Sequence, residues 1–311
     1  MSSQFKIGFD GGGTKTEGIL LDGSGAVIGV HVGAGCNPSV VGPEKARAIV
    51  LAALESLRNQ AISQAATIAP WAPPPKIVST MLCMAGSRSF WQAFAADLSG
   101  YGEVSSSDDS LPVLELATHG QPGIVLHGGT GSFVAARAPE GTLHYAGGLG
   151  WRFGDAGSGY DIGRRVVVRA LLEAQGCAAR SSLGALVCEH AQLGPGADAN
   201  AITHYFYHHQ EPNRVIAALA PAVLQLAGDG DATARELVIS SAGELLQLAT
   251  TLATKLFPEG SMPTVRAALS GPILTHRAVA PALISNSPLS LIPVEDTPIE
   301  GVRRLLARQG S

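Results

Sequence analysis

Short runs of apolar residues predict three strands near the start of the chain, at 5–10, 17–22 and 26–32. The runs "GGGTKT" and "GSG" separate them, which predicts a meander of strands joined by tight turns. Glycine-rich loops of the two best-known phosphate-binding kinds lead into a helix, whereas this loop leads straight into another strand. The first loop is therefore predicted to be the turn of a hairpin.

A helix is expected at about 43–65, because apolar residues recur at helical spacing after Pro43. The proline cluster at 69–75 then precedes an apolar strand at 77–83. The later elements expected are helices in "SFWQAFAADLSG", near 110–118, from Asp155 or Ser158 to Gly176, over 231–257 and in "PIEGVRRLLARQ", and a strand in "TVRAALSG".

The pattern of the first hairpin returns at Gly123, in "GIVLHGGTGSFVAARAPEGTLHYAGG". A shift of 116 positions places Gly12-Gly13-Thr14 on Gly128-Gly129-Thr130, and Gly25 on Gly141. An internal repeat of this length predicts a duplication. We expect two similar α/β domains, at 1–118 and 119–311, facing each other across a cleft, with the last helix packing back on the first domain.

Composition narrows the possible partners. The chain of 311 residues is 46% hydrophobic and 15% charged, which allows a large core, and its formal net charge of −4 disfavours nucleic acid. No secretory signal is apparent at the start, and the longest apolar stretches fall short of the roughly 20 residues that span a bilayer. The four cysteines are dispersed. A cytoplasmic protein with free thiols and no membrane or nucleic-acid partner is expected.

The first hairpin has the residues of a phosphate site. Glycines let backbone N–H groups approach an anion closely, Thr14 adds a hydroxyl group, and Lys15 adds a cation. Asp10, at the end of the preceding strand, is better suited to a magnesium ion held by the phosphate. The alternative is a surface hairpin whose glycines serve only the turn.

Two hairpins on one phosphate chain suit phosphoryl transfer, in which positioning and charge neutralisation do most of the work. The acceptor hydroxyl also needs a base, and Asp108 and Asp109 lie immediately before the second hairpin module. The alternative role for an aspartate here is the N-cap of the helix "SLPVLELA". Side chains alternate along a strand, so only one of the two acids is expected to face the site.

Four stretches in order, "FDGGGTKT", "GIVLHGGTGS", "GGLGWRFGDAGSGYDIG" and "AALSGPIL", resemble the phosphate-1, phosphate-2, sugar-side and adenosine motifs of N-acetylglucosamine kinases. That group belongs to the BadF/BadG/BcrA/BcrD-type ATPases of the actin/hexokinase/Hsp70 superfamily. The resemblance implies two duplicated actin-like (ribonuclease H-like) domains. It also implies ATP- and Mg²⁺-dependent phosphorylation of an amino sugar, N-acetylglucosamine to its 6-phosphate first and glucosamine as the alternative.

The resemblance also implies roles for individual residues. Asp10 would serve the magnesium ion, and Asp109 would be the catalytic base, with Asp108 as the alternative. The residues implied in ATP and phosphate binding are Gly12, Gly13, Thr14, Lys15, Gly129, Thr130, Gly131, Ser132 and Gly271. Those implied in sugar binding are Asn37, Gly148, Trp151 and Asp155.

The chain departs from the family pattern on the sugar side. Ala156 stands where the family commonly has an acid, and Trp151 comes two positions later than usual. These departures bear on which sugar is bound. An iron–sulfur ATPase activator of the same superfamily would need clustered cysteines, which are absent, and a non-catalytic sugar-responsive regulator would be expected to lack the base. The sequence leaves a homodimeric state open.

Overall fold

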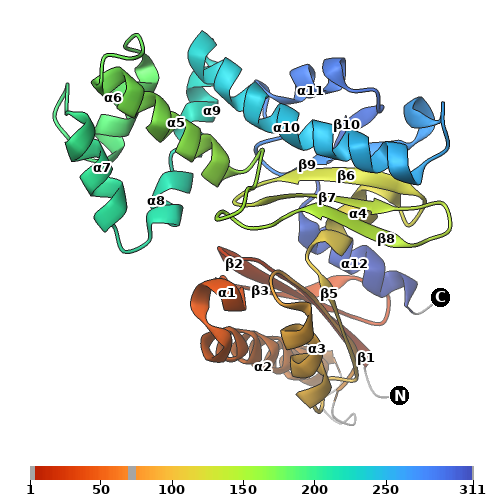
Figure 1. Cartoon of the computed structure of the whole chain (residues 1–311). Helices are drawn as coiled ribbons and strands as arrows, with labels where there is room; N and C mark the ends of the chain where they lie inside the picture. The colour runs from red at the N-terminus through yellow and green to blue at the C-terminus, as the bar shows by residue number, and fades with distance from the viewer. Residues whose placement is uncertain (1–3, 69–74, 310–311) are drawn as a thin grey trace. The chain divides into compact units, whose positions relative to one another are not determined.

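The structure is a computed structural model that describes residues 4–68 and 75–309. It divides into two compact units (Figure 1). The first unit comprises residues 1–119 and 296–311, and the second unit comprises residues 120–295. The expected proline cluster lies outside the described residues, apart from Pro75.

The first unit contains a five-stranded mixed sheet with strand order β3-β2-β1-β4-β5. The first three strands pair antiparallel, while β1, β4 and β5 pair parallel. The strands are β1 (Gln4–Gly11), β2 (Lys15–Leu21), β3 (Val27–Ala34), β4 (Lys76–Met84) and β5 (Glu103–Asp108). The helices are α1 (Pro38–Val41), α2 (Pro43–Ile68), α3 (Arg88–Asp97), α4 (Ser110–Thr118) and α12 (Pro298–Arg308).

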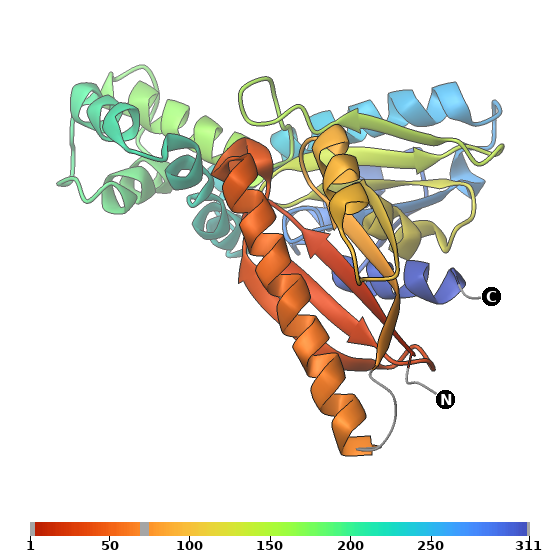
Figure 2. The same ribbon diagram turned by 90° about the horizontal axis from the view of Figure 1, so that it is seen from below.

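Helices cover both faces of this sheet because the strands are apolar on both sides. On one face, α2 packs on β1, β2 and β3, where Phe9 and Leu20 are fully buried (Figure 2). On the other, Val302 and Leu306 of α12 pack against Ile19 and neighbouring apolar residues. Two-sided burial is typical of sheets with parallel strands.

The second unit has a sheet of the same topology, in the order β10-β9-β6-β7-β8. Its strands are β6 (Gly123–Gly128), β7 (Ser132–Arg137), β8 (Leu143–Gly147), β9 (Arg266–Ser270) and β10 (Leu291–Pro293). Its helices are α5 (Gly159–Ala174), α6 (Ser182–His190), α7 (Ala199–His208), α8 (Pro212–Ala217), α9 (Ala220–Gly228), α10 (Ala232–Leu256), the 3₁₀ turn η1 (Met262–Thr264) and α11 (Ala280–Asn286).

The predicted duplication is visible in the turns. Gly25 and Gly141 both adopt positive φ and donate to the carbonyl three residues earlier, at 3.0 and 2.9 Å. The hairpins themselves differ by one residue, because Gly11 pairs with Thr16 but Gly128 pairs with Ser132. The offset between the copies is therefore 117 before the loop and 116 after it, where a single shift of 116 had been expected.

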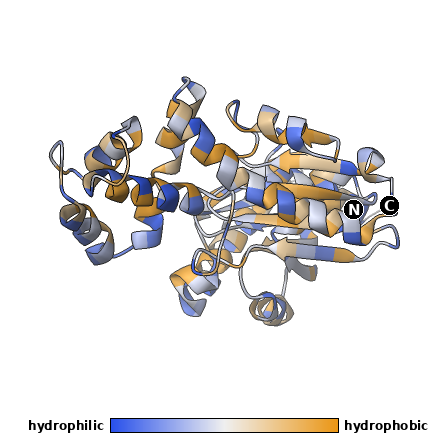
Figure 3. Cartoon of the chain, turned by 45° about the horizontal axis from the view of Figure 1, so that its top comes forward, coloured by the Kyte–Doolittle hydropathy of each residue, from blue (hydrophilic) through white to orange (hydrophobic). Residues whose placement is uncertain are grey.

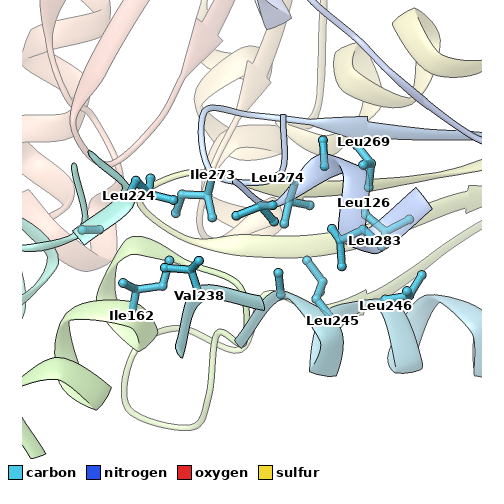
Figure 4. Packing of buried hydrophobic residues seen from close by; sticks show 14 of the residues in the cluster. Leu126, Ile162, Leu224, Val238, Leu245, Leu246, Leu269, Ile273, Leu274 and Leu283 are labelled. Atoms are coloured by element: carbon cyan, nitrogen blue, oxygen red, sulfur yellow. The ribbon is translucent and has the colours of Figure 1, made fainter. Parts of the chain in front are cut away.

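The long helix α10 lies on the sheet of the second unit. Leu245 and Leu246 point from it into the cluster that contains Leu126 of β6 and Leu269 of β9 (Figure 4). By length and composition this one helix among the described residues could also cross a membrane. Its apolar stripe is the core of the unit, which is the usual reason for such a composition. Hydrophobic residues colour much of the sheets, whereas the helices carry both hydrophobic and hydrophilic residues (Figure 3). Strand β5, with the sequence EVSSSD, is an exception among the strands.

Other predicted boundaries hold within a few residues. Ser158, not Asp155, caps α5, because its hydroxyl accepts a hydrogen bond from the Asp161 N–H at 3.1 Å. All four cysteines are free thiols, as expected, and Cys36 and Cys83 are buried.

Candidate active site

The loop between β1 and β2 has an exposed tip and a firmly held base. The Gly12 N–H donates to the Lys15 carbonyl at 2.9 Å, and the Gly12 carbonyl accepts from the Cys36 N–H at 3.0 Å. The Gly35 N–H also donates to the Thr14 carbonyl at 3.1 Å. Gly13, Thr14 and Lys15 are exposed. This loop therefore offers backbone and side-chain donors on a rigid support.

Two carboxylates lie at the carboxyl edge of the same sheet. Asp10 is in β1, one residue before its end, and Asp109 directly follows β5. Burial raises the pKa of Asp10 to about 7, with further contributions from the charges of Asp109 and Glu17, while Lys15 lowers it. The Lys15 ammonium also forms an ion pair with Glu17 at 2.8 Å.

Asp109 occupies the N-cap position of α4 without acting as a cap. Its backbone is helical, at φ −62° and ψ −14°, and its side chain makes no capping hydrogen bond. The alternative that it serves only as a helix cap is therefore wrong. Burial raises its pKa to about 6, and the negative charge of Asp108 adds to the effect.

The Asp108 side chain forms an ion pair with Arg88, the first residue of α3. Arg88 Nε donates to Asp108 Oδ1 at 3.3 Å, and Nη2 donates to Oδ2. Sequence reasoning missed Arg88. The available signal was that β4, which precedes α3, and β5 both end at this edge of the sheet.

The loop after β4 joins these elements. The Ala85 N–H donates to the Gly11 carbonyl at 2.7 Å, and Trp91 Nε1 donates to the Ala85 carbonyl at 2.9 Å. Gly86, at φ +98°, passes so close to Asn37 that an added Cβ would lie 2.6 Å from Oδ1. Asn37 Oδ1 accepts from the Ser39 N–H at 3.0 Å and caps α1. Asn37 is thus held beside the loops that follow β1 and β4.

In the second unit, the loop 129–131 turns between β6 and β7. The Gly129 carbonyl accepts from the Gly159 N–H at 2.8 Å, which fixes the loop to the start of α5. Ser132 Oγ is buried and has no hydrogen-bond partner among the described residues. A buried hydroxyl group left unsatisfied in this way has a free energy cost that a bound polar ligand would remove.

Gly271 follows β9 and lies against the end of β6. Its φ is +85°, and an added Cβ would be 2.4 Å from the Gly128 carbonyl oxygen. His127 lies beside it, hydrogen-bonded to Ser270 Oγ at 3.2 Å and stacked on Phe133 with ring centroids 4.9 Å apart. Burial lowers the pKa of His127 to about 4, so this ring is neutral near pH 7.

The loop between β8 and α5 carries the remaining predicted residues. Asp155 is buried, accepts from the Gly150 N–H at 3.1 Å, and has a pKa raised to about 6 by burial. Its Oδ2 lies 3.6 Å from where a Cβ on Gly131 would be, so this carboxyl group is beside the loop 129–131. Trp151 is 38% exposed and packs on Tyr160, with ring centroids 5.5 Å apart.

Gly148 belongs to the same loop as Asp155, at φ +62°, where an added Cβ would be 2.1 Å from the Tyr145 hydroxyl oxygen. The far end of the loop is fixed by the Gly157 N–H, which donates to Ser241 Oγ at 3.0 Å. Ser241 in turn donates to Asp161 at 2.7 Å. These contacts hold the loop to α10.

The carboxylates of the site fit a magnesium ion that is shared with a ligand. Within residues 4–68 and 75–309, no three His, Cys, Asp or Glu side chains form a metal-binding group. Magnesium usually keeps several waters and takes only one or two protein carboxylates together with phosphate oxygens. Asp10, whose ionised form is opposed by two neighbouring carboxylates, fits such an ion because a nearby cation favours the carboxylate. The residues present are compatible with Mg²⁺ held jointly with a nucleotide.

Comparisons with known proteins identify the family of this chain. Residues 7–299 match the BadF/BadG/BcrA/BcrD ATPase family. The chain is 26% identical over 264 residues to the N-acetyl-D-glucosamine kinase of Dictyostelium discoideum, covering 82% of this chain and 81% of that protein. It is 26% identical over 191 residues to the glucosamine kinase of Vibrio cholerae, covering 60% and 61%.

Among solved structures, a candidate N-acetylglucosamine kinase from Chromobacterium violaceum is similar with a TM-score of 0.76 and 25% identity, covering 97% of this chain and 98% of that one. A ROK family glucokinase from Streptomyces griseus, 13% identical, shares the fold with a TM-score of 0.51 over 98% of this chain and all of that one. The duplicated actin-like α/β fold expected from the sequence is confirmed.

Proposed function

Because the chain belongs to the BadF/BadG/BcrA/BcrD ATPase family, we propose that it is an ATP-dependent kinase that phosphorylates an amino sugar, N-acetylglucosamine before glucosamine. The observation that carries this proposal is the position of Asp109 at the carboxyl edge of the first unit's sheet, near Asp10 and without a capping role. A carboxylate whose pKa is raised towards neutrality is suited to accept a proton.

In the proposed reaction, the 6-hydroxyl oxygen of the sugar attacks the γ-phosphorus of ATP. The bond from that phosphorus to the β–γ bridging oxygen breaks and ADP leaves, while the hydroxyl proton passes to Asp109. Asp10 would hold Mg²⁺, which when bound offsets the negative charge of the phosphates. The residues proposed to bind the phosphates and adenosine are Gly12, Gly13, Thr14, Lys15, Gly129, Thr130, Gly131, Ser132 and Gly271.

The sugar is proposed to contact Asn37, Gly148, Trp151 and Asp155. Asn37 uses its side-chain oxygen in the α1 cap, so its amide nitrogen is the group that we assign to a sugar oxygen. Asp155 has a carboxyl group that can accept from sugar hydroxyls. With ATP as the phosphoryl donor, the proposed site of action is the cytoplasm.

The direct test is ADP release with MgATP and N-acetylglucosamine, glucosamine, N-acetylmannosamine, glucose or buffer alone. We expect strong stimulation by N-acetylglucosamine, with glucosamine second and glucose and buffer near background. Product analysis should find phosphate on the 6-oxygen. If none of these sugars stimulates ADP release although MgATP binds, the kinase proposal fails and a sugar-responsive regulator becomes the better explanation.

The pH dependence of catalysis should have an acidic limb. Asp109 acts as a carboxylate, so activity is present above its pKa of about 6 and is lost as the pH falls through that value. With Mg²⁺ in excess, Asp10 is held ionised, and the fall in kcat/KM reports Asp109 together with Asp155, which has a similar pKa of about 6. The profile should be measured from pH 5 to 8 with the preferred sugar subsaturating. A profile that stays flat down to pH 5 contradicts Asp109 as the base.

A further inference from the structure

We propose that the ion pair between Arg88 and Asp108 is an electrostatic shield for the base, which makes Arg88 a positioning residue for phosphoryl transfer. This inference rests on the proposed function. Arg88 would act through Asp108, by neutralising a carboxylate that neighbours the base.

The shield spans two adjacent parallel strands. Met84, the last residue of β4, pairs with Asp108, the last residue of β5. The chain leaves β4 through a short loop and begins α3 at Arg88, which returns its guanidinium group to the end of β5. Both carboxylate oxygens of Asp108 accept from this guanidinium, a two-pronged geometry that fixes the acid's orientation as well as its charge.

The charges at this edge of the sheet show why the site needs the ion pair between Arg88 and Asp108. Asp10, Asp108 and Asp109 place three carboxylates at one edge of the sheet: the charge of Asp109 raises the pKa of Asp10, and the charge of Asp108 raises the pKa of Asp109. Lys15, whose charge lowers the pKa of Asp10, also forms an ion pair with Glu17. Without Arg88, the charge of Asp108 would be left beside the base and would repel an incoming polyphosphate.

The exposure of the pair argues against a purely structural role. The Arg88 side chain is 68% exposed and that of Asp108 29%. Surface ion pairs contribute little to stability, because solvent screens them and ordering long side chains has an entropic cost. Removing Arg88 should therefore leave the fold intact while changing the local charge.

The test is a cycle of Arg88→Ala, Asp108→Asn and the double variant, assayed with MgATP and the preferred sugar. We expect Arg88→Ala to lower kcat by about tenfold, because the unpaired carboxylate of Asp108 would repel the negative charge of the phosphoryl group being transferred. Asp108→Asn alone should stay within about threefold of wild type, and adding it to Arg88→Ala should restore activity to the same range. The kcat of Arg88→Lys should lie between those of the wild type and Arg88→Ala, since lysine keeps the charge but loses the two-pronged geometry.

Rescue by the double variant separates the shield from other roles. If Arg88 contacted substrate or only held α3 in place, removing Asp108 as well could not restore turnover, and that result would overturn the proposal, as would an Arg88→Ala enzyme with wild-type kcat. Arg58→Ala is the matched control, because it removes an arginine from another exposed ion pair of the same unit. Thermal unfolding should be unchanged in all variants.

Failure of the kinase proposal would be recognised separately, as a wild-type protein that turns over no amino sugar. The same cycle would then be measured as MgATP affinity by calorimetry. The shield predicts weaker binding in Arg88→Ala and recovery in the double variant, and equal affinities in all four proteins would refute it.

Discussion

Replacing Asp109 with asparagine is expected to lower kcat by about 100- to 10,000-fold, the range in which general acid–base catalysis contributes. The amide has nearly the same shape, and the side chain makes no capping hydrogen bond that the change would break. Folding and MgATP affinity should therefore be kept. Steady-state kinetics with the preferred sugar, together with MgATP binding by calorimetry, measure both expectations.

Asp108→Asn is the matched control for this change, since it makes the same substitution one residue earlier. Its oxygens bind Arg88, so we expect a loss of no more than about threefold. If Asp108→Asn proved the inactive variant and Asp109→Asn kept its turnover, the roles of the two acids would have to be exchanged.

Substituting alanine for Gly271 should have the largest effect in the second unit. Its φ of +85° costs an L-residue about 1–2 kcal/mol, and the new Cβ would stand 2.4 Å from the Gly128 carbonyl oxygen, a backbone atom that cannot turn away. The loop after β9 or the end of β6 must move. We expect unfolding of this unit at lower temperature and an ATP KM raised by about tenfold or more, as is common when groups that position a substrate shift.

Gly141→Ala separates the effect of the close contact with Gly128 from the effect of backbone strain. Gly141 has a similar φ of +92° in the same unit, but no atom lies within 4 Å of its added Cβ. Gly141→Ala should lose only the stability that the positive φ of an alanine costs, and its KM for ATP should equal that of the wild type. Equal behaviour of the two variants would mean that the close approach to Gly128 is unimportant.

Local signals in the sequence were enough to predict the strands, the helices and the duplication, and the motifs that resemble a known family added the actin-like fold. Glycine turns and strand-length apolar runs have strong local preferences, so the repeat through Gly25 and Gly141 could be found without any structure. Asp108 and Asp109 could be proposed as candidate bases because they come just before the second hairpin module, and the family resemblance favoured Asp109. The comparisons confirm the family and the actin-like fold, and they include sugar kinases among the relatives.

Contacts between segments far apart in the sequence could not be predicted. Arg88 and Asp108 are 20 residues apart; strands that end at one edge of the sheet bring their segments together, but no sequence pattern pairs these two side chains. The capping role of Asn37 depends on how the chain turns into α1, and the proximity of Asp155 to Gly131 depends on a loop with several positive-φ glycines. Such details follow from tertiary packing, which a single sequence does not show.

The packing of α12 has a consequence for biosynthesis. Ile19, Leu21, Met81 and Cys83 form one apolar face of the first sheet, yet the residues that cover it, Val302 and Leu306, are translated after the whole second unit. At about 5–20 residues per second, that face stays uncovered on the ribosome for roughly 10–45 seconds. The second unit can fold during synthesis, whereas the first can complete its core only when translation is nearly over. The nascent first unit is therefore the part of this chain that most needs a chaperone.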